Sequence, residues 1–501
     1  MTRKALHAKL AGVTLALGCA ACSESVNALY RDDGGTVSAD AQSETGDGIV
    51  ASIQVCPPSL PGAPAGVGPL PSAIQLAYQR TEMTAYTHFG LNTFDGTEYG
   101  DSAKDVPSLF NPTNLDVSEW VSELKNAGFQ QATLVARHHT GFCLWPSAYT
   151  DYSVKNSPWK NGQGDLVREF VDAVRAARMR VGLWLSPWDQ HYPSSSPDYE
   201  TYFRHLLTEL LTNYGPIYEI LWDGYGAPTS LDWKGIVMLA KQLQPTVLVW
   251  TGGQIAATGA DLRYLGSQSG QATRTTSNVA DVPNGGPSNV WYPAEAPVSV
   301  LSTWFWHPDS TIISLKALQT VYFTTVGMNT TLILNVPPST TGQFDTPETN
   351  LLGAFGTWYA SLYKTNLVRG QPISADSTWE NTGFDAAKVV DDDVCTYWAA
   401  ASGKTSARLE VTPSSAITFK VISIREPIEL GERTTSYHVE LRQNGSWNKA
   451  PVDASGNQVQ GTLIGQRQLW QLNATTADAI ALVIDSAKDS PAIAEFGVYW
   501  Y

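Results

Sequence analysis

From about residue 84, short apolar runs alternate along the chain with segments in which apolar residues recur every three or four positions. The recurring pattern predicts amphipathic helices, and the short runs between them predict buried strands. The expected strands are 85–88, 132–138, 181–186, 218–222, 247–251, 290–293 and 331–336, with a weaker candidate at 299–305. Such alternation is typical of a parallel sheet whose strands are joined by crossover helices.

The segment 116–127 illustrates the helical pattern. Asp116 can accept a hydrogen bond from an unpaired backbone N–H, and Gly128 can adopt the left-handed conformation that ends a helix. Between them, one face collects the apolar side chains of Val117, Trp120, Val121 and Leu124. About eight strands, each followed by such a helix, predict an α/β fold, a (β/α)8-like TIM barrel rather than a doubly wound sheet.

The pattern changes after an expected last helix at 351–363. Beyond about Gly370, apolar and polar residues alternate in the short runs 407–411, 418–424, 437–442, 479–484 and 494–499. This period of two predicts an antiparallel β-sandwich. The chain has 501 residues, more than the roughly 250 to 300 over which one hydrophobic core keeps growing. We therefore expect a barrel domain at 71–363 and an all-β sandwich domain at 368–501.

The N-terminal segment has the composition of an export signal and a spacer. Residues 1–22 contain basic side chains, an uncharged apolar run too short to span a membrane, and a small-residue stretch with Cys19 and Cys22. The stretch ending at Cys19 is similar to a bacterial lipoprotein processing site, and plain secretion is the alternative. Residues 23–70 predict a flexible linker. The expected location is the periplasm, the outer membrane or the extracellular space.

Charge and aromatic content narrow the class of partner. The chain carries 32 Lys and Arg against 47 Asp and Glu, a net charge of −15, which makes nucleic acid a poor partner. Aromatic residues make up 10% of the chain, and flat aromatic surfaces suit sugar rings, although most of them fill cores. Cys56, Cys143 and Cys395 have no metal-ligand spacing, and one disulfide among them can form in an oxidising compartment.

Candidate chemistry gathers where the expected strands end, which is where barrels of this kind place their reacting side chains. The residues at these positions are His88, His138, His139, Trp188, Asp223 and Glu295. Asp223 follows a hydrophobic strand and precedes Gly224, which permits a tight turn, so it is the candidate catalytic carboxylate. A capping role for Asp223 in the next segment is the alternative.

The stretch 137–147 contains the adjacent His138 and His139 together with Trp145. Adjacent residues on an extended chain point to opposite faces and rarely chelate one ion, and no further ligand stands at a recognisable spacing. A metal site is therefore disfavoured. Neutral imidazoles that hydrogen-bond to sugar hydroxyl groups, with Trp145 as a flat apolar face, fit the pattern better.

Several stretches, in order, resemble the α-L-fucosidases of glycoside hydrolase family 29. They span about residues 70–350 and are 88–94, 137–147, 149–164, 185–189, 221–224, 292–295 and 332–338. The resemblance implies a retaining exo-glycosidase that removes terminal α-L-fucose from fucosylated oligosaccharides or glycoconjugates and requires no metal or other cofactor. Such an enzyme uses two carboxyl groups roughly 5 to 5.5 Å apart.

The resemblance also implies roles for particular residues. The nucleophile motif falls on Asp223, and Glu98 occupies a further pocket position. The motifs that hold the fucose fall on His88, His138, His139 and Trp188.

The second carboxylate is missing where the resemblance places it. The acid/base Glu should stand some 45 residues beyond the nucleophile, and 268 − 223 = 45, but this chain has Gln268. Glu295 and Glu98 are candidate substitutes, unless the acid lies elsewhere. Losing general acid catalysis costs a factor of about 10² to 10⁴ with poor leaving groups. The alternative function is therefore a fucose-binding pseudoenzyme or a weak fucosidase.

The stretch 389–398 in the expected sandwich is similar to an early strand motif of discoidin-like (F5/8 type C) carbohydrate-binding modules. Its Asp391, Asp392 and Asp393 offer the oxygen ligands that a structural Ca²⁺ prefers. A solvated acidic turn is the alternative.

Overall fold

The computed structural model describes residues 56, 61–101, 104–252, 255, 259–265, 268–272, 276–283, 286–449 and 451–501. The predicted export signal, the lipoprotein site and most of the predicted linker lie outside the described residues. Of the helices within these ranges, none has the length and apolar character needed to cross a membrane.

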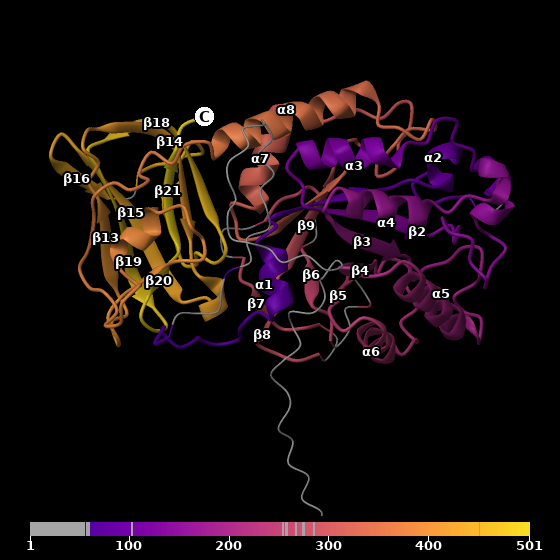
Figure 1. Cartoon of the computed structure of the whole chain (residues 1–501), viewed down its shortest axis with the longest axis horizontal. Coiled ribbons are helices and arrows are strands. Elements are labelled where there is room, and N and C mark those ends of the chain that lie inside the picture. The colour runs from indigo at the N-terminus through magenta and orange to yellow at the C-terminus, as the bar shows by residue number, and fades with distance from the viewer. Residues whose placement is uncertain are drawn as a thin grey trace, which may run out of the picture. The chain divides into compact units, whose positions relative to one another are not determined.

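Eight parallel strands close into a barrel, and Figure 1 labels β2, β3, β4, β5, β6 and β9 among them. Around the barrel they follow in the order β1 (Met83–Thr87), β10 (Thr331–Asn335), β9 (Ala294–Ser299), β6 (Leu262–Tyr264), β5 (Leu248–Thr251), β4 (Glu219–Trp222), β3 (Arg180–Leu185) and β2 (Gln131–Arg137). The pairing of β2 with β1 closes the ring. The prediction of a (β/α)8-like barrel is confirmed.

Helices precede, connect and follow these strands. The α-helices are α1 (Ala73–Gln79), α2 (Leu91–Asp95), α3 (Val117–Asn126), α4 (Leu166–Ala176), α5 (Tyr199–Asn213), α6 (Trp233–Leu243), α7 (Leu315–Thr325) and α8 (Thr346–Leu362). Short 3-10 turns in the barrel domain are η1 (Pro107–Leu109), η2 (Val154–Asn156) and η3 (Trp159–Gly162). The expected start of α3 is correct, because Asp116 accepts a hydrogen bond from the backbone N–H of Glu119.

One end of the barrel is closed by α1. Tyr78 of this helix is buried in an apolar cluster with residues of the barrel strands, among them Tyr86 and Trp184. The Tyr78 hydroxyl donates a hydrogen bond to Glu295 near the start of β9. The closed end is therefore the one at which the strands begin, and the end at which they finish is left for a site.

The structure corrects the prediction between residues 260 and 305. The expected strand at 290–293 is β8 (Val290–Trp291), which pairs with β7 (Val279–Ala280) in a separate two-stranded sheet. The barrel strand is β9, which contains Glu295 as its second residue, so placing Glu295 after a strand end was wrong. Strand β6 was not predicted from the sequence, because its three residues, Leu-Arg-Tyr, contain no apolar run.

Two further details of that region differ from expectation. The weaker strand candidate at 299–305 contributes only Ser299 to a barrel strand. Between β6 and β9, the residues that the structure describes hold the β7–β8 hairpin in place of a crossover helix.

The C-terminal domain is antiparallel, as predicted. One sheet contains β11 (Ile373–Ala375), β13 (Ala407–Val411), β19 (Ala479–Ala487), β15 (Thr434–Gln443) and β16 (Ser446–Lys449), with β17 (Gln460–Gly461) beside β15. A second contains β18 (Gln468–Ala477), β14 (Ile417–Arg425) and β21 (Glu495–Tyr499), and β12 (Trp398–Ala399) pairs with β20 (Ala492–Ile493). The short turns are η5 (Ala386–Val390) and η6 (Ile428–Leu430).

Both larger sheets contribute to one apolar core, which is what makes the domain a sandwich. Leu409 and Val439 from the first sheet and Ile422 and Phe496 from the second are buried in the same cluster. Alternate residues of β13 are buried, as the period of two in its sequence predicts.

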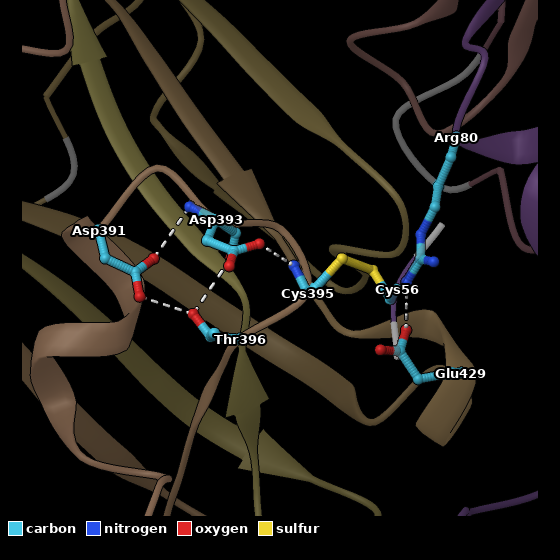
Figure 2. Close-up of a disulfide and its surroundings, with 7 residues drawn as sticks. All are labelled: Cys56, Arg80, Asp391, Asp393, Cys395, Thr396 and Glu429. Atoms are coloured by element: carbon cyan, nitrogen blue, oxygen red, sulfur yellow. Dashed lines mark hydrogen bonds and ion pairs between the residues drawn. A yellow bond between two sulfur atoms is a disulfide. The ribbon is translucent and has the colours of Figure 1, made fainter. Parts of the chain in front are cut away.

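A disulfide ties the start of the described chain to the sandwich. Cys56 is bonded to Cys395, and their Cα atoms are 5.1 Å apart (Figure 2). Sequence left the pairing of the cysteines open. Cys143 is buried and free. The last part of the predicted flexible linker also has fixed contacts, since Val67 donates its backbone N–H to Leu430 and Gly62 accepts the indole N–H of Trp379.

Buried charges join the sandwich to the segment between α1 and β1. Glu82 pairs with the guanidinium groups of Arg425, at 2.8 Å, and Arg467, at 2.7 Å. Nearby, Arg80 forms an ion pair with Glu429 at 3.3 Å, which Figure 2 shows beside the disulfide. Arg425 also pairs with Glu495, at 3.0 Å, whereas Glu82 is the acidic partner of the buried Arg467, so loss of Glu82 would leave Arg467 as an unpaired buried charge.

Candidate active site

A cavity of about 410 Å³ lies at the end of the barrel where the strands finish. Its wall includes His88, which follows β1, His138 and His139, which follow β2, and Asp223, which follows β4. Parallel strands in a barrel bring their C-terminal ends to one face, so side chains more than a hundred residues apart in sequence meet here. Four of the residues singled out in the sequence therefore share one cavity.

Asp223 is a partly exposed carboxylate on this wall. Its Oδ1 accepts a hydrogen bond from the backbone N–H of Tyr225 at 3.0 Å, and its Oδ2 accepts none from the described residues. Burial raises the pKa of Asp223 above its ordinary value, and the N–H of Tyr225 opposes that rise. The free oxygen makes Asp223 an available nucleophile or base.

The hydrogen bonds around His88 determine which of its ring nitrogens faces a ligand. The side-chain amide of Asn335 donates through Nδ2 to the backbone carbonyl of Trp304 at 2.8 Å, so Oδ1 is its acceptor atom. His88 Nδ1 lies 2.7 Å from that oxygen and must donate to it. The Nε2 atom of His88 is then left as a hydrogen-bond acceptor.

His139 is fixed in the same way by Ser186. The Ser186 hydroxyl donates to the backbone carbonyl of Trp188 at 2.7 Å, so its oxygen accepts from His139 Nδ1 at 2.6 Å. Nε2 of His139 is again an acceptor.

All three histidines are neutral at pH 7. Burial lowers the pKa of His88 to about 4 and that of His139 to about 3. Burial, and then the neighbouring imidazoles, lower the pKa of His138 well below its ordinary value. Neutral imidazoles that present acceptor nitrogens suit the hydroxyl groups of a sugar.

Glu98 also lines the cavity, and both of its oxygens are engaged. Oε2 accepts the backbone N–H of Trp304 at 2.9 Å, while Oε1 lies 2.8 Å from Nε2 of His307 and accepts the backbone N–H of Phe305 at 3.4 Å. These contacts fix the position of the Glu98 carboxylate on the wall.

Gln268 lies on the cavity wall too, with a left-handed backbone φ of 53°. Its Oε1 accepts the indole N–H of Trp304 at 3.3 Å. Because an indole N–H can only donate, this contact leaves the amide Nε2 of Gln268 available as a donor.

Glu295 does not line the cavity. It is fully buried at the opposite end of the barrel, where it meets Tyr78 and Glu219. Burial first, and then the charge of Glu219, raise its pKa well above the ordinary value. The interpretation of Glu295 as a substitute acid is therefore not supported, because its side chain points into the closed end.

Trp145 is also outside the cavity. Its indole is buried and donates a hydrogen bond to Glu209 at 2.9 Å, and the same carboxylate accepts bonds from Ser147 and the backbone of Ala148. Trp145 therefore organises its own loop. Trp188, which the family motifs assign to fucose binding, is not among the residues that line the cavity, and it packs against His139 with ring centroids 4.9 Å apart.

Most of the aromatic wall was not predicted from the sequence. The additional aromatic residues are Tyr86, Tyr99, Trp184, Tyr225, Trp250, Tyr264 and Trp304. Tyr86, Trp184 and Trp250 could have been predicted from the period of two along a strand, because they lie on barrel strands and alternate with residues that face outward. Loops carry Tyr99, Tyr225 and Trp304, and local sequence offers no comparable period there.

The three aspartates of the sandwich do not converge on one point. Asp391 accepts bonds from the backbone N–H of Asp393 and from Thr396, as Figure 2 shows. Asp392 accepts instead from Asn366 and pairs with Arg369. Within the described ranges, no three His, Cys, Asp or Glu side chains are grouped so that they could hold a metal ion. The residues present do not fit the Ca²⁺ site considered from sequence.

The barrel and its cavity define a class of protein: a glycosidase-like barrel with one available carboxylate among neutral histidines and aromatic rings. A family model described as Alpha-L-fucosidase matches residues 73–362, and one described as F5/8 type C domain matches 372–496. The chain therefore belongs to the α-L-fucosidase family, glycoside hydrolase family 29, and is a fucose-releasing enzyme with a C-terminal F5/8 type C domain.

Individual relatives agree with this assignment. "Alpha-L-fucosidase 1" of Arabidopsis thaliana is 35% identical over 461 residues, 87% of this chain and 88% of that protein. A Ruminococcus gnavus fucosidase of the same family, solved in complex with fucose, has a TM-score of 0.80 and 29% identity, covering 88% of this chain and 97% of that one. A family member from a rumen bacterium has a TM-score of 0.75 and 31% identity, covering 87% and 78%. These similarities favour the enzyme over the fucose-binding alternative.

Proposed function

We propose that this enzyme removes terminal α-L-fucose from fucosylated glycans by two displacements at the anomeric carbon, with retention of configuration. Asp223 is the nucleophile. The observation that carries this assignment is the free Oδ2 of Asp223 on the cavity wall, just beyond the end of β4. Among the described wall residues, the only other carboxylate is Glu98, whose oxygens are both engaged.

In the first displacement, Oδ2 of Asp223 attacks C1 of the fucose and the bond from C1 to the aglycone oxygen breaks. A covalent fucosyl ester forms, and the electron pair leaves with the aglycone oxygen. In the second, water attacks C1, loses a proton to solvent and displaces the Asp223 carboxylate. The Nε2 atoms of His88 and His139 accept hydrogen bonds from fucose hydroxyl groups and hold the ring for both steps.

The aglycone oxygen receives a hydrogen bond, not a proton, from Gln268. Trp304 orients the amide so that Nε2 can donate. An amide N–H stabilises developing negative charge but is not an acid, so the departing oxygen takes its proton from solvent. Aryl fucosides with acidic leaving groups should consequently react faster than natural glycans.

A trapping experiment tests this mechanism. A 2-fluoro fucoside with a good leaving group should inactivate the enzyme, and the peptide that contains Asp223 should gain the mass of one 2-fluorofucosyl group. Proton NMR of an ordinary reaction should detect α-fucose before β-fucose. Label on a different residue, or β-fucose as the first product, would contradict the proposal. Asp376→Ala, an exposed aspartate of the sandwich, is the matched control and should still be labelled at Asp223.

The enzyme is proposed to act outside the cytoplasm, exported by residues 1–22 and either lipid-anchored at Cys19 or Cys22 or released. The disulfide between Cys56 and Cys395 supports an oxidising compartment. Mass spectrometry of the mature N-terminus from the native host tests this. A lipid-modified Cys supports the anchor, an unmodified processed end supports secretion, and an intact Met1 contradicts export.

A further inference from the structure

We propose that Tyr99 and Tyr225, here called the rim pair, form a binding subsite for the neutral pyranose ring to which the fucose is attached. This inference rests on the proposed attack by Asp223, because reaction at C1 beside that residue leaves the aglycone directed toward the open mouth of the cavity. The other end of the barrel is closed by α1 and Tyr78. A terminal fucose must therefore enter first, with the rest of the glycan trailing past the mouth.

The rim pair is the part of the aromatic wall with large rings exposed to solvent. Tyr99 is 51% exposed and Tyr225 is 57% exposed, whereas His88 and His139 are buried. The two rings lie 5.4 Å apart, tilted by 31°, and Tyr99 stacks on His139 at 6.2 Å with an angle of 10° between the planes. Both rings thus pack against other rings while about half of each side chain stays exposed, an arrangement suited to an apolar sugar face.

Two glycines hold the rim pair in place. Tyr99 is followed by Gly100 and Tyr225 by Gly226, and both glycines have left-handed φ angles, of 89° and 63°. A Cβ on Gly226 would lie 2.5 Å from the ring of Trp188. One on Gly100 would lie 2.4 Å from the Thr140 side chain.

These close approaches let both loops pack directly on the structure beneath them. Trp188 also meets the ring of Tyr225 edge-on, at 5.6 Å. A subsite built from rings that are already positioned loses little conformational entropy when a ligand binds.

The charges of the wall select the class of sugar. Its described residues include two carboxylates, Asp223 and Glu98, and no Lys or Arg. An acidic sugar would meet repulsion without a compensating cation, so the subsite suits a neutral ring. A series of contacts links Gln268, beside the proposed leaving group, to the rim pair. Gln268 contacts Trp304, Trp304 contacts Glu98, and Glu98 directly precedes Tyr99 in the sequence.

The test compares two substrates that share the fucose but differ in the aglycone. One is a neutral fucosylated oligosaccharide, and the other is α-L-fucosyl fluoride, whose leaving group is a single atom. Tyr225→Ala should lower kcat/KM for the oligosaccharide about tenfold more than for the fluoride, mostly through KM. Tyr225→Phe keeps the ring and should keep most of the preference. Tyr149→Ala, at a tyrosine that is 48% exposed and stacked on His205, is the matched control and should leave the ratio unchanged.

Gly226→Ala provides a second variant that retains both rings but displaces the Tyr225 loop, and it should change the ratio in the same direction. Equal losses on the two substrates would mean that the rim pair holds the fucose itself and would overturn the inference. An unchanged ratio in both variants would overturn it as well. Failure of the proposed mechanism would look different, since Asp223→Ala would then still turn over the fluoride.

Discussion

Strand β4 carries a carboxylate at each end, and the two have opposite surroundings. Glu219, its first residue, is fully buried and meets Gln131 and Glu295 at the closed end of the barrel. Asp223, directly beyond its last residue, lies on the wall of the cavity at the other end. Only Ile220, Leu221 and Trp222 stand between a carboxylate that solvent cannot reach and one that a substrate can reach.

The position of a carboxylate along a barrel strand decides what that carboxylate can do. At the closed end, burial raises the pKa of Glu219 to about 7 and that of Glu295 well above its ordinary value, so the pair keeps a proton and holds strands together. At the open end, Asp223 has a free oxygen and room for a ligand. Chemistry therefore belongs to the open end.

The largest effect on the reaction rate should come from removing the carboxylate of Asp223 at the open end, and removal of the Glu219 carboxylate at the closed end is the matched comparison. Asp223→Ala should lower kcat for an activated aryl α-L-fucoside by about 10⁴-fold or more, because the attacking group is lost. Glu219→Gln should leave that rate within a few fold, since Glu219 lies outside the cavity. Steady-state kinetics of the two purified variants checks this. Turnover by Asp223→Ala close to the parental rate would show that Asp223 is not the nucleophile.

Installing an acid at the open end should produce the next largest effect. Gln268→Glu should raise kcat/KM for a natural fucosylated oligosaccharide by about 10²-fold or more, and that for an activated aryl fucoside much less, because only the poor leaving group needs a proton. A plot of rate against leaving-group pKa should become flatter. Gln458→Glu adds the same charge at an exposed site of the sandwich and is the control. No gain in the Gln268 variant would indicate that another group already supplies the proton.

Glu219 at the closed end should make the free energy of unfolding depend on pH. An unfolded Glu ionises near pH 4.5, while folded Glu219 keeps its proton up to about pH 7. The stabilising contribution of this proton is therefore complete below about pH 4.5 and is lost as the pH rises through 7. The loss is on the order of 3 kcal/mol. Glu219→Gln should flatten the wild-type decline in unfolding free energy, measured by denaturant titration from pH 4.5 to 7.5. Parallel curves would show that Glu219 is ionised throughout.

The smallest effect should follow removal of divalent metal ions. Treatment with EDTA, followed by gel filtration, should leave both the rate with an aryl fucoside and the thermal midpoint unchanged. The described residues contain no group of ligands for an ion, and the proposed steps use none. A loss that added Ca²⁺ restores would show that a metal contributes after all.

Much of the fold and part of the site could be read from the sequence. Asp223 could be predicted as the candidate catalytic carboxylate, because it directly follows a hydrophobic run and precedes a glycine. His88, His138 and His139 were identified by their position after expected strands and by the family motifs. The apolar run at 290–293 predicts a barrel strand that ends before Glu295, whereas the barrel strand begins at Ala294 and contains Glu295.

The rest could not be predicted, because the signals are not local. The three-residue β6 and the two-residue β7 and β8 are too short to show a period. Tyr99 and Tyr225 come from different loops, and nothing near either residue shows that their rings meet. The pairing of Cys56 with Cys395 joins residues 339 positions apart.

By itself, the sequence determined the two folded domains, their fold classes and the carboxylate at the end of β4, because helix and strand periods and capping residues act over a few neighbouring positions. Only the tertiary structure decided that Glu295 lies at the closed end while Gln268, Tyr99 and Tyr225 surround the opening. The physical reason is that strand register and loop packing assign a side chain to one end of the barrel or the other, and both depend on contacts between distant segments.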